Sequence, residues 1–310
     1  MRQDPPRAVR PRGCEWPAAA ITVAKVAIGS HRTVRADFAF VASWLELPAR
    51  RQQLMLGGTM DLIGKVALVS GGSGDIGGAI ARALALAGVD VALTYVGSGE
   101  RASATAEAVR ASGRRAHSIQ LDQRDPVAIE ACVGKVLAEF GQLDILVNNA
   151  AWNIGIPFAD LEALNPDVWD RVLETNLRGP YLLARAFAAE LRRHKAGRIV
   201  NIASLAGLTP GGSSIAYAAS KAALIHLTHC LAIALAPEVT VNCIAPGLVD
   251  GTRMAARVPE PIKQEARSRA VLGRTGSARD IADQVVTFCR AESVTGQVIV
   301  VDGGMPEGMR

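Results

Sequence analysis

The fold of this chain is indicated most clearly by the segment Val66-Ala-Leu-Val-Ser-Gly-Gly-Ser-Gly-Asp-Ile-Gly77. A short apolar run is followed by a cluster of glycines and then by an Ala-rich segment, 76–87, with the pattern of a helix. Glycines at such a turn let the backbone approach a phosphate, and the helix that follows offers free N–H groups to the anion. The stretch therefore predicts a strand, a phosphate-binding turn and a helix, although an ordinary strand-to-helix turn is the alternative.

Apolar runs and helical segments alternate outward from this stretch, beginning at Met60. Continuous apolar strands that alternate with helices are typical of a parallel sheet covered on both faces. We therefore expect an α/β fold with a doubly wound parallel sheet (a Rossmann fold) in one domain, residues 60–310. The further strands are expected at 89–95, 116–121, 145–147, 198–203, 239–244 and 298–301, and the further helices at 102–111, 126–140, 166–191 and 217–236.

The first 59 residues differ from the rest of the chain. They hold four early prolines, and their nine basic and four acidic residues account for the whole net charge of +5. Residues 60–310 are neutral, so the basic pI gives no support for a nucleic-acid partner. We expect residues 1–59 to be either a poorly ordered extension or an upstream reading frame outside the native polypeptide. A signal or transit segment is the weaker alternative.

Composition excludes several classes of protein. With 49% hydrophobic and 20% charged residues, the chain is neither disordered nor collagen-like. No uncharged apolar run reaches the ~18 residues of a membrane-spanning helix, so we expect no membrane segment. The five cysteines are odd in number and form no C-x-x-C pair. They predict reduced thiols in a cytoplasmic protein, with no disulfide framework and no metal site.

The glycine turn resembles that of the short-chain dehydrogenase/reductase family, which reads T-G-x-x-x-G-x-G. Ser70 stands at the threonine, Gly71 and Gly77 match, and Asp75 replaces the middle glycine. A carboxylate close to the pyrophosphate of a cofactor would weaken its binding unless the side chain turned away. We expect Asp75 to turn away and to cap the helix that follows.

The resemblance implies a nicotinamide cofactor, and the end of the second strand bears on which one. NAD-binding members place an acid there to hold the ribose 2′-hydroxyl, whereas this chain has Tyr95. A 2′-phosphate is therefore not repelled, and Ser98 and Arg101 lie within reach of one. The basic residue that the family carries inside the turn is missing, because that position is Gly74. NADP(H) is thus favoured mildly over NAD(H).

Tyr217-Ala-Ala-Ser-Lys221 carries the expected chemistry. On a helix, side chains four residues apart share a face, so the phenol and the ammonium can point into one cleft. A free phenol has a pKa of about 10, and a neighbouring positive charge stabilises the phenolate. We therefore expect Lys221 to lower the pKa of Tyr217. Tyr–Lys pairs at this spacing also occur on ordinary helix surfaces.

Two further residues match the family's catalytic set. Ser204 follows the fifth predicted strand, thirteen residues ahead of Tyr217 as in the family. Its hydroxyl is expected to polarise a carbonyl oxygen while Tyr217 donates the proton. Asn176 matches the position that in the family helps to anchor a water between the lysine and solvent. The resemblance therefore implies four catalytic residues, Asn176, Ser204, Tyr217 and Lys221.

The remaining matches concern the cofactor. Asn148-Asn-Ala-Ala151 resembles the family's N-N-A-G stretch, and Pro246-Gly247 matches the loop that receives the nicotinamide carboxamide. Asp122 matches an adenine-contacting residue, with a helix cap or a loop acid as the alternative, and Thr252 comes one residue late because of an inserted glycine. The cofactor-binding residues that the resemblance implies are Gly71, Ser73, Asp75, Ile76, Gly77, Tyr95, Asp122, Asn149, Ala150, Tyr217, Lys221, Pro246, Gly247, Val249 and Thr252.

These matches predict reversible hydride transfer between a nicotinamide and a small-molecule ketone or secondary alcohol. Ala92-Leu-Thr-Tyr95 and Val301-Asp-Gly-Gly304 look most like 3-oxoacyl-carrier-protein reductases. The stretch after Ala151 lacks the basic residue that such reductases carry to meet an acidic carrier protein. A dehydrogenase of small ketones, sugars or polyols therefore remains the alternative, and residues 249–272, which select the substrate in the family, do not decide it.

The alternative outside the enzymes is a cofactor-sensing regulator that has no catalytic activity. Such proteins typically lose the tyrosine or the lysine, and both are present here, so an enzyme is favoured. The resemblance also implies a homotetramer that assembles through two long helices. The Ala-rich faces at 181–189 and 218–236 would permit close helix packing.

Overall fold

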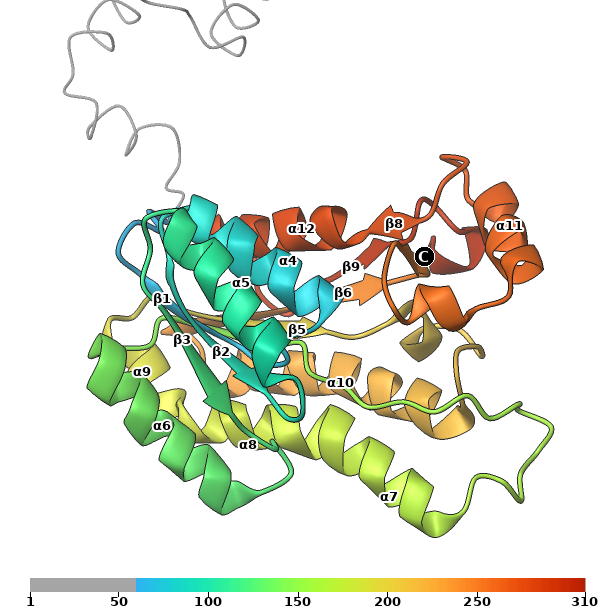
Figure 1. Ribbon diagram of the computed structural model, residues 1–310, viewed down its shortest axis with the longest axis horizontal. Helices are drawn as coiled ribbons and strands as arrows, with labels where there is room; N and C mark the ends of the chain where they lie inside the picture. Colours follow the sequence, from blue (N-terminus) through green and yellow to red (C-terminus); the bar gives the residue numbers. More distant parts are fainter. Residues whose placement is uncertain (1–59, 310) are drawn as a thin grey trace, which may run out of the picture. The chain divides into compact units, whose positions relative to one another are not determined.

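The computed structural model describes residues 60–309, and a seven-stranded parallel sheet forms their centre (Figure 1). The strand order is β3-β2-β1-β4-β5-β6-β9, which is the doubly wound arrangement expected from the sequence. The predicted N-terminal extension, residues 1–59, lies outside the described residues. The strands are β1 (Val66–Val69), β2 (Asp90–Tyr95), β3 (Ala116–Gln120), β4 (Ile145–Asn148), β5 (Gly197–Ile202), β6 (Val239–Pro246) and β9 (Val298–Val301).

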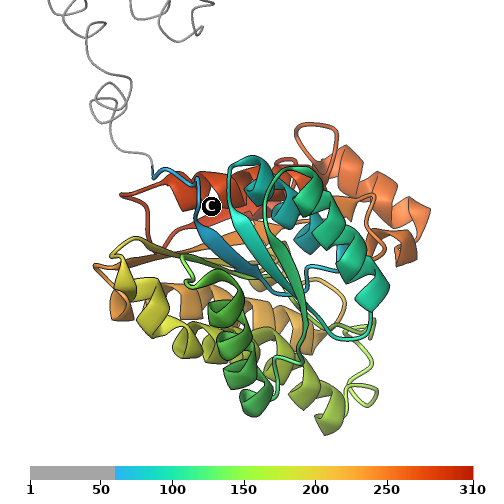
Figure 2. The ribbon, with the colours of Figure 1, turned by 60° about the vertical axis from the view of Figure 1, so that its left-hand side comes forward.

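Helices cover both faces of this sheet (Figures 1 and 2). One face packs against α4, α5 and α12, and the other packs against α6, α8 and α10. The helices are α4 (Asp75–Leu86), α5 (Gly99–Ala111), α6 (Pro126–Phe140), α7 (Pro166–Leu173), α8 (Gly179–Ala186), α9 (Ala188–Arg193), α10 (Ile215–Ala234), α11 (Glu260–Arg269) and α12 (Ala278–Arg290).

β1 shows why the strands of this sheet have unbroken apolar sequences. Successive side chains of a strand point to opposite faces of the sheet. Ala67 and Val69 accordingly join the core under α4 and α12, whereas Val66 and Leu68 join the core under α6 and α8. All four are at most 1% exposed, so both faces of β1 are buried in a core.

The helix expected over 166–191 is interrupted. It consists of α7, one π-helical turn (η2, Glu174–Arg178), α8 and α9. Pro180 explains the change of winding, because it has no N–H to donate to the carbonyl four residues earlier, at Asn176. The structure also adds a two-residue parallel ladder, β7 (Val249–Asp250) with β8 (Gly276–Ser277), which was not predicted.

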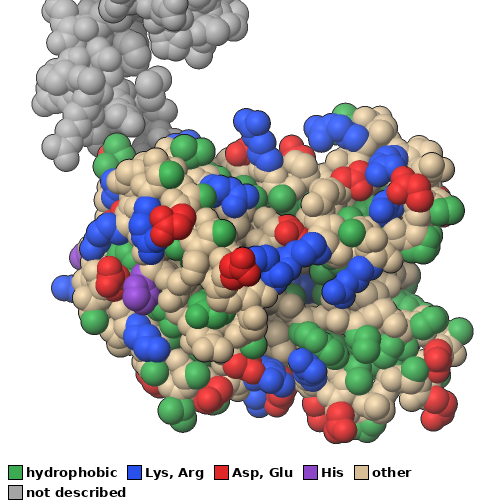
Figure 3. Space-filling model, viewed as in Figure 1, with side chains coloured by type: hydrophobic (Ala, Val, Ile, Leu, Met, Phe, Trp, Pro, Cys, Tyr) green, Lys and Arg blue, Asp and Glu red, His purple; other side chains and the backbone are tan. Residues whose placement is uncertain are grey.

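Parallel strands bring their carboxyl ends to the same edge of the sheet. β1 and β4 are neighbours there, but the chain proceeds from β1 to one side and from β4 to the other. Ligands of doubly wound folds bind in the crevice at such a switch point. Figure 3 shows Lys and Arg side chains on both sides of a hollow between the two helix layers. Within residues 60–309, no helix has both the length and the apolar character needed to cross a bilayer.

Candidate active site

The glycine turn follows β1 and needs glycine at two positions. Gly71 has a φ of +67°, and a Cβ added there would lie 2.9 Å from the Cα of Ala150. A Cβ added at Gly77 would lie 2.4 Å from the carbonyl oxygen of Gly71. The turn is therefore closed too tightly for a side chain at either position.

Hydrogen bonds tie this turn to the end of β4 across the switch point. The hydroxyl of Ser70 accepts the N–H groups of Asn149 at 3.0 Å and Ala150 at 2.9 Å. The amide of Asn149 in turn donates to the carbonyl of Ser70 at 2.8 Å and to that of Gly71 at 3.3 Å. The two chain segments on either side of the crevice are therefore held at a fixed spacing.

The first turn of α4 fits a phosphate group. Its N-cap is Gly74, and no side chain caps the helix. An α-helix leaves its first N–H groups without an intrahelical partner, so those of Asp75, Ile76 and Gly77 point to the turn. Unpaired amides and the positive end of the helix dipole form an anion site. The diphosphate of a dinucleotide matches these donors.

The prediction that Asp75 caps α4 is wrong. Its carboxylate accepts the backbone N–H of Arg253 at 2.8 Å and the Nε–H of the same residue at 3.2 Å. Arg253 lies after β7, far along the chain, and offers the carboxylate both a backbone donor and a positive charge. Those two donors together outcompete the single amide that a cap would provide.

The first turn of α5, which follows β2, brings a positive charge to the glycine turn. Tyr95 ends β2 and is half-buried against the core. Arg101, in α5, donates through Nε to the carbonyl of Ser73 at 3.3 Å and is hydrogen-bonded to the hydroxyl of Ser98. A guanidinium therefore lies beside the turn although Gly74 has no side chain.

Asp122, after β3, is engaged by a neighbour. Its carboxylate accepts from the guanidinium of Arg124 at 2.6 to 3.1 Å, and that hydrogen bonding holds its pKa below the usual range. The N-cap of α6 is Asp125, so Asp122 does not cap that helix. Its role toward an adenine stays a prediction.

Asn176 is fully buried in the π-helical turn. Its Oδ1 accepts the N–H of Trp152 at 2.8 Å, and its Nδ2 donates to the carbonyl of Trp152 at 3.0 Å and to the hydroxyl of Ser220 at 3.1 Å. Ser220 lies on α10 beside Lys221. The amide therefore fixes the segment after β4 against the helix that carries the tyrosine and the lysine.

Ser204 and Tyr217 come from the end of β5 and the start of α10. Ser204 caps a short 3-10 turn by accepting the N–H of Ala206 at 3.2 Å, and Ser214 caps α10 by accepting the N–H of Tyr217 at 3.2 Å. Tyr217 is 9% exposed. Burial raises the pKa of its phenol, and hydrogen bonding by the Ser204 side chain opposes that shift.

Lys221 lies beside this phenol, as the spacing predicted. Its Nζ is 5.7 Å from the centre of the Tyr217 ring and donates to the carbonyl of Ile202 at 2.8 Å. Burial lowers the pKa of the amine to about 8. The prediction that Lys221 lowers the pKa of Tyr217 is nevertheless wrong for this structure, because the loss of water around the phenol raises this pKa and only the hydrogen bonding by Ser204 opposes the rise.

The loop after β6 packs on the segment after β9. The N–H of Gly247 donates to the carbonyl of Val301 at 3.0 Å, and a Cβ at Gly247 would lie 2.6 Å from that of Asp302. The hydroxyl of Thr252 donates to the carbonyl of Val249 at 2.8 Å and accepts the N–H of Ala255 at 3.1 Å. Pro246 is the last residue of β6, so this loop also starts at the crevice edge.

Most of the predicted residues therefore lie near the carboxyl ends of the strands or in the first turns of the helices that follow, whereas Asn176 lies in the π-helical turn between α7 and α8. Two contributors were missed. Ser214 carried a signal, because a serine three residues before the Tyr217 amide has the spacing of an N-cap. No local sequence pattern indicated Arg253, because only the folded chain brings it into contact with Asp75.

Comparisons with known proteins agree with this geometry. Residues 72–306 match the sequence model of a family described as enoyl-(acyl carrier protein) reductase. The chain is 39% identical over 248 residues to a 3-oxoacyl-[acyl-carrier-protein] reductase of Aquifex aeolicus, covering 79% of this chain and 98% of that protein.

Two solved structures are similar in fold as well as in sequence. One is a short-chain dehydrogenase from Burkholderia cenocepacia in complex with NADP, with a TM-score of 0.73 and 41% identity over 80% of this chain and 100% of that one. The other is an NAD+-bound xylitol dehydrogenase, with a TM-score of 0.74 and 30% identity over 79% of this chain and 100% of that one. Because the matches run through the glycine turn, the tyrosine helix and nearly the full length of these proteins, this chain belongs to the short-chain dehydrogenase/reductase family and is an NAD(P)-dependent oxidoreductase.

Proposed function

We propose that the enzyme reduces the ketone of a 3-oxoacyl thioester, with Tyr217 as general acid and Ser204 as the hydrogen-bond donor to the carbonyl oxygen. Lys221 and Asn176 complete the catalytic set. The observation that carries this proposal is the buried phenol of Tyr217, with the Ser204 side chain and the Lys221 amine as its neighbours.

At neutral pH the site holds a neutral phenol and a charged amine, which are the protonation states from which carbonyl reduction starts. A phenol whose pKa is raised by burial stays protonated at neutral pH and can give its proton to a substrate oxygen. The Lys221 amine, with a pKa of about 8, is mostly an ammonium at pH 7. Its positive charge then stabilises the phenolate that the transfer leaves behind. A nicotinamide cofactor held at the glycine turn would supply the hydride.

We further propose NADP(H) as the preferred cofactor. Arg101 supports this preference, because its guanidinium is hydrogen-bonded to the carbonyl of Ser73 and to the hydroxyl of Ser98, next to the end of β2. Tyr95 provides no carboxylate there that would repel a 2′-phosphate. Arginine binds phosphate through charge-assisted hydrogen bonds, so these residues form a site for that group.

The proposed thioester substrate rests on similarity and on one contact. The Aquifex relative is named as a 3-oxoacyl-[acyl-carrier-protein] reductase. The segment after Ala151 has no basic residue of its own, but the guanidinium of the exposed Arg171 lies 4.2 Å above the ring of Trp152. A cation from α7 therefore stands beside this segment, where an acidic carrier protein could meet it.

The proposal is tested by NADPH consumption with acetoacetyl coenzyme A, a soluble 3-oxoacyl thioester, against a panel of small ketones. Xylitol and other polyols with NAD+ provide the comparison for the alternative substrate class, which the similarity to a xylitol dehydrogenase keeps open. We expect kcat/KM for the thioester to exceed that of every other compound by at least ~10-fold. A polyol or simple ketone as the best substrate would contradict the proposed substrate class.

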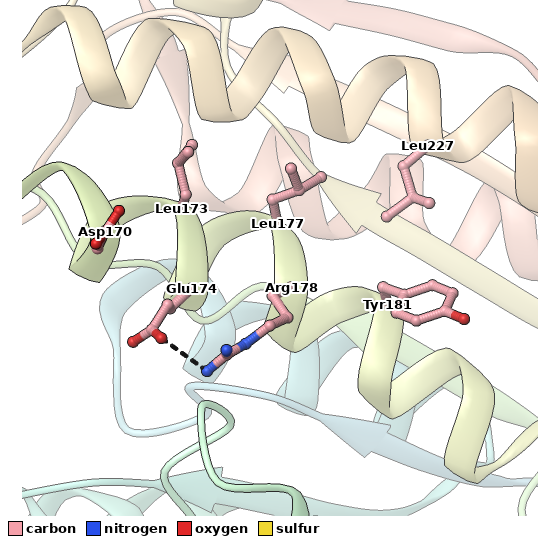
Figure 4. Close-up of a pocket in the computed structure, with 7 residues that line it drawn as sticks. All are labelled: Asp170, Leu173, Glu174, Leu177, Arg178, Tyr181 and Leu227. Atoms are coloured by element: carbon pink, nitrogen blue, oxygen red, sulfur yellow. Dashed lines mark ion pairs between the residues drawn. The ribbon is translucent and has the colours of Figure 1, made fainter.

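We also propose a homotetramer that uses the face formed by α7, η2, α8 and α10. An apolar groove lies on this face between Leu173, Leu177, Tyr181 and Leu227 (Figure 4). Tyr181 is 43% exposed there. Asp170 and the ion pair of Glu174 with Arg178 at 2.9 Å border the groove.

A second copy of the chain would cover these side chains, and light scattering measures whether the mass in solution is that of four subunits. A mass of one subunit in solution would contradict the proposed assembly. We place the enzyme in the cytoplasm, because the described cysteines, Cys132, Cys230, Cys243 and Cys289, are all free thiols.

A further inference from the structure

An ion pair joins the glycine turn to the loop after β7. The backbone N–H of Arg253 donates to the carboxylate of Asp75 at 2.8 Å, and its Nε–H donates to the same carboxylate at 3.2 Å. A terminal nitrogen of the guanidinium also reaches the carbonyl of Ser73 at 3.4 Å. Arg253 therefore contacts the turn at three points, although it lies 178 residues further along the chain.

The carboxylate stands where a negative charge is unfavourable for the cofactor. Asp75 is the first residue of α4, and the free amides of this turn fit a diphosphate. A carboxylate a few ångströms from a diphosphate repels it unless a cation compensates. Arg253 is the cation that lies on this carboxylate.

We propose that Arg253 is a cofactor-binding residue that contacts the diphosphate, and that Asp75 is its positioning residue. This inference rests on the proposed binding of a nicotinamide dinucleotide at the turn. Asp75 uses one oxygen to hold the backbone of Arg253 and so keeps the guanidinium at the mouth of the turn. Asp75 stands where the family carries a glycine, and the positive charge of Arg253 offsets the negative charge that this replacement introduces.

A purely structural role does not account for the pair. The side chain of Asp75 is 36% exposed and that of Arg253 is 48% exposed. Ion pairs with this much solvent access contribute little to folding stability. The loop that carries Arg253 follows Gly251, whose φ is +76°, and its next residues form a short 3-10 turn. We therefore expect the pair to affect cofactor affinity much more than thermal stability.

The test is a double-mutant cycle on the full chain, with Asp75→Gly, Arg253→Gln and the double variant. Dissociation constants for NADPH and NADH are measured from nucleotide fluorescence, and melting temperatures are measured alongside. Arg257→Gln is the matched control, because Arg257 is exposed on the same segment and pairs with no acid in residues 60–309. Adenosine 2′-monophosphate, which has no diphosphate, is the control ligand.

Arg253→Gln should weaken binding of the tighter dinucleotide by about tenfold or more, because it leaves Asp75 uncompensated. Removing Asp75 as well should recover only the part of that loss that the uncompensated carboxylate causes. The double variant should therefore bind more tightly than Arg253→Gln but more weakly than the wild-type chain, which keeps the contact of Arg253 with the diphosphate. Arg257→Gln should bind normally, and all variants should bind adenosine 2′-monophosphate alike and melt within a few degrees of each other. Unchanged binding in Arg253→Gln, or a double variant that binds as tightly as the wild-type chain, would overturn the contact of Arg253 with the diphosphate. Equal losses in Arg253→Gln and the double variant would overturn the role of Asp75. If the wild-type chain bound neither dinucleotide, the proposed function would fail together with this inference.

Discussion

Lys221 directs its amine to the carbonyl of Ile202, at 2.8 Å, while the same Nζ lies 5.7 Å from the centre of the Tyr217 ring. The carbonyl belongs to the last residue of β5, so the sheet itself fixes where the lysine ends. The ammonium is thereby kept beside the phenol, and no carboxylate among residues 60–309 pairs with it. A lysine held in this way can respond to a charge that develops on Tyr217 during the reaction.

The activity should depend on pH through Lys221. Burial lowers the pKa of its amine to about 8, so the group is charged below this pH and neutral above it. We expect kcat/KM for carbonyl reduction to fall as the pH rises through 8, since the stabilising charge beside Tyr217 is lost. Lys221→Met should be much less active and should show no such fall. A wild-type profile that is level from pH 7 to about 9.5 would contradict this assignment.

Replacing Ser204 should test the hydrogen bond to the substrate oxygen. Ser204→Ala removes the donor, and the loss of one such donor lowers kcat by about 10²-fold or more. Ser204 has a φ of −167°, an extended conformation that threonine adopts easily, so Ser204→Thr keeps the hydroxyl and should retain more activity. Steady-state kinetics of both variants check this, and equal activity of the alanine and threonine variants would argue against a role for the hydroxyl.

Arg101 should determine the choice between the two nicotinamide cofactors. Arg101→Gln removes the guanidinium beside the Ser73 carbonyl, so we expect NADPH to bind about tenfold or more weakly while NADH binds unchanged. Arg110→Gln removes a charge from the same helix, where Arg110 pairs with Glu107, and serves as the control. Titration with both nucleotides measures the preference. An equal loss of affinity for NADH and NADPH would mean that Arg101 does not bind the 2′-phosphate.

Two glycines in helices should respond to alanine in opposite ways. A Cβ at Gly77 would lie 2.4 Å from the backbone oxygen of Gly71, so Gly77→Ala should distort the turn and weaken cofactor binding by at least ~10-fold. A Cβ at Gly134, in α6, would meet nothing within 4 Å. Gly134→Ala should therefore raise the free energy of unfolding by about 0.5–1 kcal/mol. Urea denaturation and nucleotide titration of the two variants check the contrast.

The fold was predictable because its signals are local. The buried strand 66–69 is apolar at every position. The turn that follows it brings backbone segments so close together that only glycine fits there. The N-cap of α10 could also have been predicted, because Ser214 stands three residues before Tyr217. The π-helical turn before Pro180 had a local cause as well, although its exact winding was not expected.

The parts of the site that could not be predicted depend on tertiary structure. Asp75 reads as a helix cap in the sequence, and only the folded chain brings Arg253 to it. The pKa of Tyr217 was expected to fall because Lys221 is close in sequence. It rises because the surrounding elements exclude water from the phenol, and the extent of that burial is a property of the whole fold.

Proton donation by Tyr217 is tested most directly by the activity of Tyr217→Phe, with cofactor binding measured on the same protein. Phenylalanine keeps the ring and removes the hydroxyl, so the fold, the place of Lys221 and the affinity for nucleotide should persist. We predict that kcat for carbonyl reduction falls by about 10²-fold or more while the dissociation constant of the cofactor stays within about threefold of the wild-type value. A variant that kept more than about a tenth of the wild-type kcat would contradict proton donation by Tyr217.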